Sequence, residues 1–159
     1  MSMEQLYQEL ILDHARSPHG AGLRDPFDVQ VHHVNPTCGD EVTLRVHLGG
    51  TGTIDDVSYE SAGCSISVAG ASVMADEVTG NTPEQAMQRY DRVLDVLQGR
   101  VEADPEEDGD LAAFAGVRRF PARVKCALLG WAAMRDAVSQ AVGTGAENYP
   151  GTTSDEERS

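Results

Sequence analysis

The sequence has few cysteines and no long apolar run, and each absence excludes a class of protein. Its 159 residues include three widely spaced cysteines, Cys38, Cys64 and Cys126, with no Cys-x-x-Cys pair. An odd number of distant thiols argues against a disulfide framework and predicts a reducing, cytoplasmic location. No apolar run approaches the roughly 18 residues that a membrane-spanning helix needs. The N-terminus also lacks the charged and apolar regions of a secretion signal. We therefore expect a cytoplasmic protein that does not enter a membrane.

Basic residues are also scarce. The chain carries 26 acidic and 12 basic residues, which gives a formal net charge of −14. A surface this acidic repels phosphate backbones, so nucleic acid is not an expected partner. Such a surface suits a partner with a basic docking face, although acidity that serves solubility alone is the commoner case.

The apolar pattern alternates between helical and strand periods along a chain of single-domain length. Expected helices cover residues 2–16, 65–79, 82–99, 110–115 and a long stretch from Pro121, and expected strands cover 29–32, 42–48 and 54–60. The pattern predicts an α+β fold with a small three-stranded antiparallel sheet packed on one side by helices. We expect one domain over residues 1–142 and a disordered acidic tail over 143–159. The acidic segment 102–110 is predicted to be a solvated loop.

The stretch Asn35-Pro36-Thr37-Cys38-Gly39-Asp40 places a thiol and a carboxylate two residues apart. Gly39 permits a positive φ that lets both side chains point the same way. Three thiols and one carboxylate are enough ligands for a tetrahedral Zn²⁺ site. Taken singly, each cysteine is as well explained as a small buried hydrophobic residue.

The other two thiols lie within the first two turns of expected helices or directly before them. Cys64 follows a glycine there, where free amides and the helix dipole favour a thiolate. Cys126 is expected in the second turn of the last helix, beside the basic residues Arg118, Arg119, Arg123 and Lys125. These charges would stabilise thiolates, or they are ordinary solvated surface.

Several motifs together resemble the SufU-type proteins of the IscU-like, NifU N-terminal family. They are Leu12-Asp13-His14 with Ser17-Pro18, the Asn35–Asp40 stretch, Gly63-Cys64-Ser65-Ile66-Ser67 and Arg123-Val124-Lys125-Cys126-Ala127-Leu128-Leu129. The likeness runs from Leu6 to about Val142. The scaffold-type members resemble this chain but have histidine where it has Lys125. The acidic segment between Gly99 and Arg118 also looks like an insertion of the SufU type.

The resemblance implies a zinc-dependent sulfurtransferase of the SUF iron–sulfur cluster assembly pathway. Cys38, Asp40, Cys64 and Cys126 would hold Zn²⁺, and Arg123 would take part in catalysis. Cys38 would accept persulfide sulfur from a PLP-dependent cysteine desulfurase, SufS, for transfer to the downstream SUF cluster-assembly complex.

Three alternatives remain open on the sequence. The first is a scaffold that binds a [2Fe–2S] cluster, or iron, on the same ligands. The second is a structural zinc protein that only docks partners. The third is a cysteine hydrolase with a base among His14, His32, His33 and His47, although no motif ties any of these histidines to a thiol.

Overall fold

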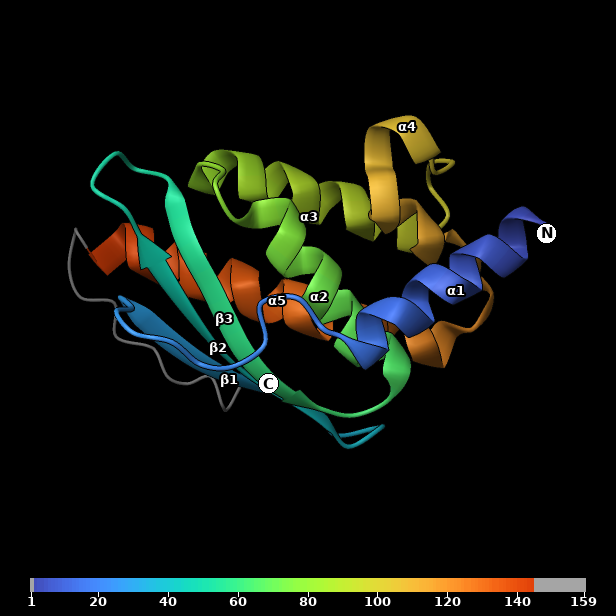
Figure 1. Ribbon diagram of the computed structural model, residues 1–159, viewed down its shortest axis with the longest axis horizontal. Coiled ribbons are helices and arrows are strands. Elements are labelled where there is room, and N and C mark those ends of the chain that lie inside the picture. The colour runs from blue at the N-terminus through green and yellow to red at the C-terminus, as the bar shows by residue number, and fades with distance from the viewer. Residues whose placement is uncertain (1, 145–159) are drawn as a thin grey trace.

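The computed structural model describes residues 2–144 and contains a three-stranded antiparallel sheet in the order β1-β2-β3. The strands are β1 (Val29–Asn35), β2 (Asp40–Leu48) and β3 (Ile54–Ala62). Helices pack on one face of this sheet (Figure 1). The predicted α+β fold is confirmed. Of the predicted tail, residues 143–159, only residues 143 and 144 are described, and both are helical.

The helical segments follow the sheet in chain order, apart from the first. They are α1 (Met3–Arg16), α2 (Ser65–Val78), α3 (Pro83–Leu97), α4 (Pro105–Asp108), the 3₁₀ segment η1 (Gly109–Arg119) and α5 (Pro121–Thr144). Capping boxes start α1 at Ser2 and α3 at Thr82. Within residues 2–144, no helix has the length and apolarity to cross a membrane.

The strand register aligns the buried side chains of the three strands, and it also determines which loops lie next to each other at the end of the sheet. Leu44 pairs with Val31 on one side and with Tyr59 on the other, and all three are buried. The same register sets Asn35 opposite Asp40, and Glu41 opposite Ala62. The tip of the β1–β2 hairpin therefore lies beside the point where β3 leads into α2.

Helices α2 and α5 cross at glycines that allow very close approach. A Cβ atom on Gly70 would come within 2.5 Å of the carbonyl oxygen of Ala127. A Cβ atom on Gly130 would come within 2.9 Å of Ala71 Cα. Since α2 begins next to Cys64 and α5 carries Cys126, this crossing sets how far apart the two thiols lie.

The helix expected from Pro121 is confirmed as α5, which is buried in its middle and exposed at its end. Trp131, Met134 and Val138 are buried, whereas Val142, in the last turn, is 53% exposed. Alanines at 127, 133, 137 and 141 are also buried. The helix is therefore covered on more than one side, because small side chains let several neighbours approach.

The acidic segment is largely exposed, as predicted, but it is helical rather than a loop, and one of its acidic side chains is buried. It forms α4 and leads into η1, which also extends well beyond the short helix expected at 110–115. Asp108 is 1% exposed and accepts two hydrogen bonds of 2.8 Å from Arg92, and its Oδ2 also accepts from the Asp104 amide. Burial alone would raise the pKa of Asp108, but these hydrogen bonds and the positive charges of Arg92 and Arg89 hold it below its ordinary value.

Replacing Asp108 with asparagine is expected to destabilise the fold by about 2 kcal/mol at neutral pH. This is less than the roughly 3–5 kcal/mol of a fully buried pair, because the Arg92 side chain keeps 26% exposure. The folded-state pKa is depressed, so this stabilisation is present above the unfolded value of 3.8 and is lost as the pH falls through the folded pKa.

Urea unfolding of wild type and Asp108→Asn at pH 7 and near pH 3 measures the difference. Glu107→Gln, at an exposed neighbour in the same helix, serves as control and should match wild type. A stability gap between wild type and Asp108→Asn that stays constant down to pH 3 would contradict this account.

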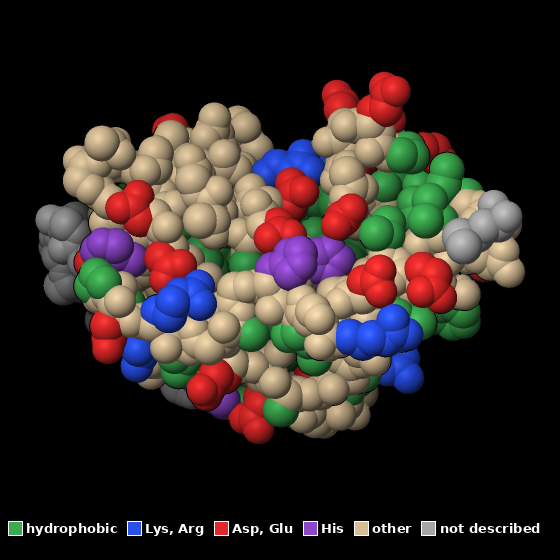
Figure 2. Space-filling view, in the orientation of Figure 1, with side chains coloured by type: hydrophobic (Ala, Val, Ile, Leu, Met, Phe, Trp, Pro, Cys, Tyr) green, Lys and Arg blue, Asp and Glu red, His purple; other side chains and the backbone are tan. Residues whose placement is uncertain are grey.

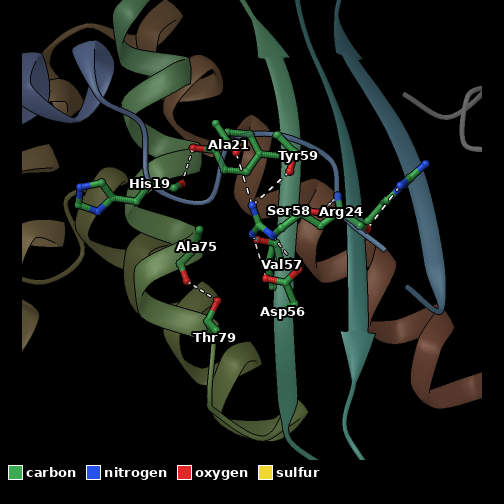
Figure 3. A network of polar contacts seen from close by, with 11 residues as sticks. His19, Ala21, Arg24, Asp56, Val57, Ser58, Tyr59, Ala75 and Thr79 are labelled. Atoms are coloured by element: carbon green, nitrogen blue, oxygen red, sulfur yellow. Dashed lines mark hydrogen bonds and ion pairs between the residues drawn. The ribbon is translucent and has the colours of Figure 1, made fainter. Parts of the chain in front are cut away.

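The segment between α1 and β1 is tied to β3 and α2 by polar contacts (Figure 3). Arg24 donates to both carboxylate oxygens of Asp56, at 3.1 and 2.9 Å. Burial raises the pKa of Tyr59 to about 12, so its phenol stays protonated and donates to the His19 carbonyl at 2.7 Å. The His19 ring points away from this network.

Candidate metal centre

Cys38 lies exposed on the turn between β1 and β2. The amides of Cys38 and Gly39 both donate to the Asn35 carbonyl, at 3.2 and 2.8 Å, and Gly39 has the positive φ of 76° that was predicted. The Asn35 side chain accepts from the Thr37 amide and donates to Cys38 Sγ at 3.6 Å. The turn therefore presents the thiol to solvent with a hydrogen-bond donor directed at its sulfur.

Asp40 is buried beside this turn, with 1% exposure. Its Oδ1 accepts a hydrogen bond of 3.2 Å from the Cys64 amide. Its Oδ2 is buried and has no hydrogen-bond partner. A buried carboxylate oxygen without a partner is costly, so a cation at this point would complete its environment.

Cys64 is the N-cap residue of α2. Burial would raise the pKa of its thiol, but the neighbouring Ser67 and Ile66 amides and the Cys126 thiol outweigh burial and lower it. Gly63, just before it, has φ 155°, and a Cβ atom there would overlap the Asp40 carboxylate and Ser67 Oγ. A glycine is needed at this position to bring Cys64 against Asp40.

Cys126 is fully buried in α5, and its Sγ lies 3.3 Å from Cys38 Sγ. Ligand atoms of Cys38, Asp40 and Cys126 lie within 4.8 Å of one another. Cys64 stands outside this tight group, although its thiol interacts with that of Cys126. Burial, and then the proximity of the Asp40 carboxylate and of the other two thiols, raises the pKa of Cys126 well above its ordinary value.

The four basic residues near Cys126 do not act together. Arg119 Nη2 lies 2.7 Å from Glu4 Oε2, and Arg118 Nη2 lies 3.7 Å from Glu102 Oε2, so each forms an ion pair away from the thiols. Lys125 is exposed. Arg123 is the member of the four whose charge faces the thiols: Cys64 first, and then Cys126, raise the pKa of its guanidinium.

The histidines considered as hydrolase bases lie beside oxygen atoms rather than beside thiols. His33 bonds to Asp136 at 2.9 Å, and His32 to Thr43 at 2.9 Å. His47 lies 3.4 Å from Asp28. His14 is held between Ser72 and Asp110. These contacts give the cysteine hydrolase alternative no support.

Sequence reasoning missed two residues of this centre. Asn35 was taken only as part of a turn, although asparagine side chains commonly cap turns by accepting from the backbone amide two positions on, as Asn35 does from Thr37. Gly63 was not given a role. Its need for close approach to Asp40 has no local signal, because the two residues meet only through the strand register.

The sequence matches the NifU-like N-terminal domain family over residues 6–141. It is 38% identical over 143 residues to the zinc-dependent sulfurtransferase SufU of Bacillus subtilis, covering 89% of this chain and 95% of that one. It is 35% identical over 139 residues to the iron–sulfur cluster assembly scaffold protein IscU of Streptococcus pyogenes, covering 87% and 86%. The chain belongs to the NifU-like N-terminal domain family.

The fold agrees with this assignment. The SufU crystal structure from Fervidobacterium islandicum superposes with a TM-score of 0.73 at 32% identity, covering 86% of this chain and 99% of that one. Both SufU and IscU are therefore among the relatives of this chain.

Proposed function

We propose that this protein is a zinc-dependent sulfurtransferase of the SUF pathway, in which Cys38 accepts sulfur from a PLP-dependent cysteine desulfurase. The observation that carries the proposal is an exposed thiol, Cys38, lying 3.3 Å from the buried thiol of Cys126. An acceptor must reach a partner's active site, whereas the remaining ligands must stay behind in the fold. The similarity to the SufU of Bacillus subtilis supports this assignment.

Four residues would hold the zinc ion: Cys38, Asp40, Cys64 and Cys126. The donor set suits Zn²⁺, which favours four thiolate, imidazole or carboxylate ligands. The buried, unpartnered Oδ2 of Asp40 is the oxygen that such an ion would satisfy. When bound, Zn²⁺ would keep the thiols in the thiolate form and protect them from oxidation.

The transfer itself is a thiolate exchange at sulfur. The Cys38 thiolate attacks the terminal sulfur of the desulfurase persulfide, and a new sulfur–sulfur bond forms. The old bond breaks, and its electron pair leaves with the desulfurase thiolate. Asn35 donates a hydrogen bond to Cys38 Sγ, and the positive charge of Arg123 lies near the Cys64 and Cys126 thiols, so these two side chains would offset negative charge at the centre.

Trapping the product tests the proposal. The zinc-loaded protein is incubated with a cysteine desulfurase and cysteine, alkylated, and mapped by peptide mass spectrometry. We expect one additional sulfur on Cys38 and a desulfurase turnover that rises with the amount of this protein. Absence of a persulfide, or its presence on Cys64 alone, would contradict the assignment.

Zinc affinity is expected to fall as the pH falls. The raised pKa of Cys126 keeps this thiol protonated at neutral pH in the metal-free protein, so metal binding must release its proton. For each proton that binding releases, the zinc affinity falls about tenfold for every unit by which the pH is lowered. Competition with a chromophoric chelator between pH 6 and 8 measures the slope, and a pH-independent affinity would exclude proton release.

A second candidate is a scaffold on which an iron–sulfur cluster is the cargo. The similarity to the IscU of Streptococcus pyogenes favours it. Lys125, which is exposed, stands where the scaffold type has histidine, so this chain offers one ligand fewer from α5. Protein purified without oxygen would be brown if it carried a cluster and colourless if it carried zinc.

A further inference from the structure

A second group of metal-binding side chains lies away from the thiols. His14 at the end of α1, His19 in the loop that follows and Asp76 in α2 place ligand atoms within 4.8 Å of one another. The face in Figure 2 carries histidine side chains near its centre, bordered by acidic ones. We propose that His14, His19 and Asp76 bind a second divalent transition-metal ion, independently of the thiol centre.

His14 is already oriented as a metal ligand. It is 4% exposed, and its Nε2 lies 2.8 Å from Asp110 Oδ2. Because a carboxylate accepts hydrogen bonds, Nε2 carries the ring proton and the lone pair of neutral His14 is on Nδ1. A carboxylate behind a histidine is the arrangement that holds the ring orientation and raises the basicity of metal-binding histidines.

The partner of His14 Nδ1 can be given up at low cost. This nitrogen lies 2.6 Å from Ser72 Oγ, which also accepts a hydrogen bond of 2.8 Å from the His19 amide. If Nδ1 binds a metal ion, Ser72 Oγ keeps the His19 amide as its donor, and the Ser72 hydrogen can turn to the Tyr59 hydroxyl, with which Ser72 also interacts. The buried hydroxyl is therefore not left without a partner.

His19 and Asp76 supply the accessible side of the site. Their side chains are 53% and 46% exposed, and His19 Nδ1 lies 2.6 Å from Asp76 Oδ2. An ion can thus enter from solvent, and these two side chains have room to move apart around it. Asp76 and Asp110 together would offset the charge of a divalent cation.

The ligand chemistry defines the class of ion. Two imidazoles and one carboxylate suit Zn²⁺, Fe²⁺ and related first-row ions, and they leave positions open for water. Hard ions such as Ca²⁺ prefer an all-oxygen set, which this group lacks.

Cobalt titration distinguishes this site from the thiol centre. Co²⁺ bound to thiolates gives an intense near-ultraviolet charge-transfer band, whereas Co²⁺ on nitrogen and oxygen ligands gives only weak visible bands. We expect metal-free wild type to bind two equivalents, one of which adds no charge-transfer absorbance. In a parallel experiment with Zn²⁺, the ring NMR signals of His14 and His19 should shift.

The variants His19→Ala and Asp76→Asn should each lose the Co²⁺ equivalent that adds no charge-transfer absorbance. Both should still bind the Co²⁺ equivalent that gives the charge-transfer band. Both positions are half-exposed, so neither change should disturb folding. The matched control is His32→Ala, because His32 and Glu41 form a similar surface pair, 50% and 51% exposed with 3.2 Å between them. The control should still bind two equivalents.

Two results would overturn the proposal. The first is that every Co²⁺ equivalent bound by the wild type adds charge-transfer absorbance. The second is a His19→Ala variant that, like wild type, binds an equivalent without this absorbance. Failure of the thiol centre to bind cobalt would instead remove the charge-transfer band alone, and so would contradict the proposed sulfurtransferase without touching this site.

Discussion

Replacing Cys38 with alanine is expected to abolish sulfur uptake and to return desulfurase turnover to the level seen without this protein. No other thiol can substitute, because Cys126 is fully buried and Cys64 is partly covered at the start of α2. The loss should be complete, since the variant lacks the only exposed thiol among the described residues. Turnover assays and peptide mass spectrometry of the alkylated protein measure it.

The fold of the Cys38→Ala variant should survive. Cys38 is exposed on a turn held by backbone hydrogen bonds from residues 38 and 39 to Asn35. Surface substitutions of this kind usually change stability by less than about 0.5 kcal/mol. The comparison is made on metal-free proteins by circular dichroism and urea unfolding, because losing a zinc ligand has its own effect on stability.

The neighbouring Thr37→Ala variant is the matched control. Thr37 is also exposed on the turn, and its contact with Asn35 uses the backbone amide, which alanine retains. It should stimulate the desulfurase as wild type does. A fully active Cys38→Ala variant would rule out Cys38 as acceptor, whereas an inactive Thr37→Ala variant would point to the shape of the turn instead.

Replacing Gly70 with alanine is expected to destabilise the protein by about 1–3 kcal/mol. The new Cβ atom would lie 2.5 Å from the Ala127 carbonyl oxygen, and a backbone atom can move away only if α5 moves. The helix preference for alanine, worth about 1 kcal/mol, offsets part of this cost. Chemical denaturation measures the net change.

The same substitution should also weaken metal retention, because α2 begins beside Cys64 and α5 carries Cys126. Pushing the helices apart separates these two ligands. Gly143→Ala is the matched control: it adds the same methyl group to α5, where nothing lies within 4 Å, and it should be as stable as wild type. Unchanged stability and zinc content in Gly70→Ala would show that the crossing can relax.

Much of the secondary structure could be predicted, because its signals are local. The alternation in β2, the capping boxes at Ser2 and Thr82, and the positive φ of Gly39 each depend on neighbours within a few residues. The Cys38–Asp40 pairing and the position of Cys64 at a helix start were predicted for the same reason.

Other features could not be predicted, because their partners are far away in sequence. Composition predicted that Asp108 would be exposed to solvent, but the side chain is buried and accepts hydrogen bonds from Arg92 on α3. The sequence did not distinguish the basic residues near Cys126 from one another, yet Arg119 pairs with Glu4 and Arg118 with Glu102. His19 drew no attention, and only the packing of the loop after α1 against α2 brings it to Asp76.

By itself, the sequence determined most of the helices and strands and the position of Cys64 at a helix start, since backbone preferences act over a few residues. The tertiary structure alone decided that Cys38 and Cys126, 88 positions apart, lie 3.3 Å from each other. That distance depends on the strand register and on the glycine crossing of α2 and α5. Both arise from burying side chains that are distant in the chain, and no local pattern records how those side chains pack.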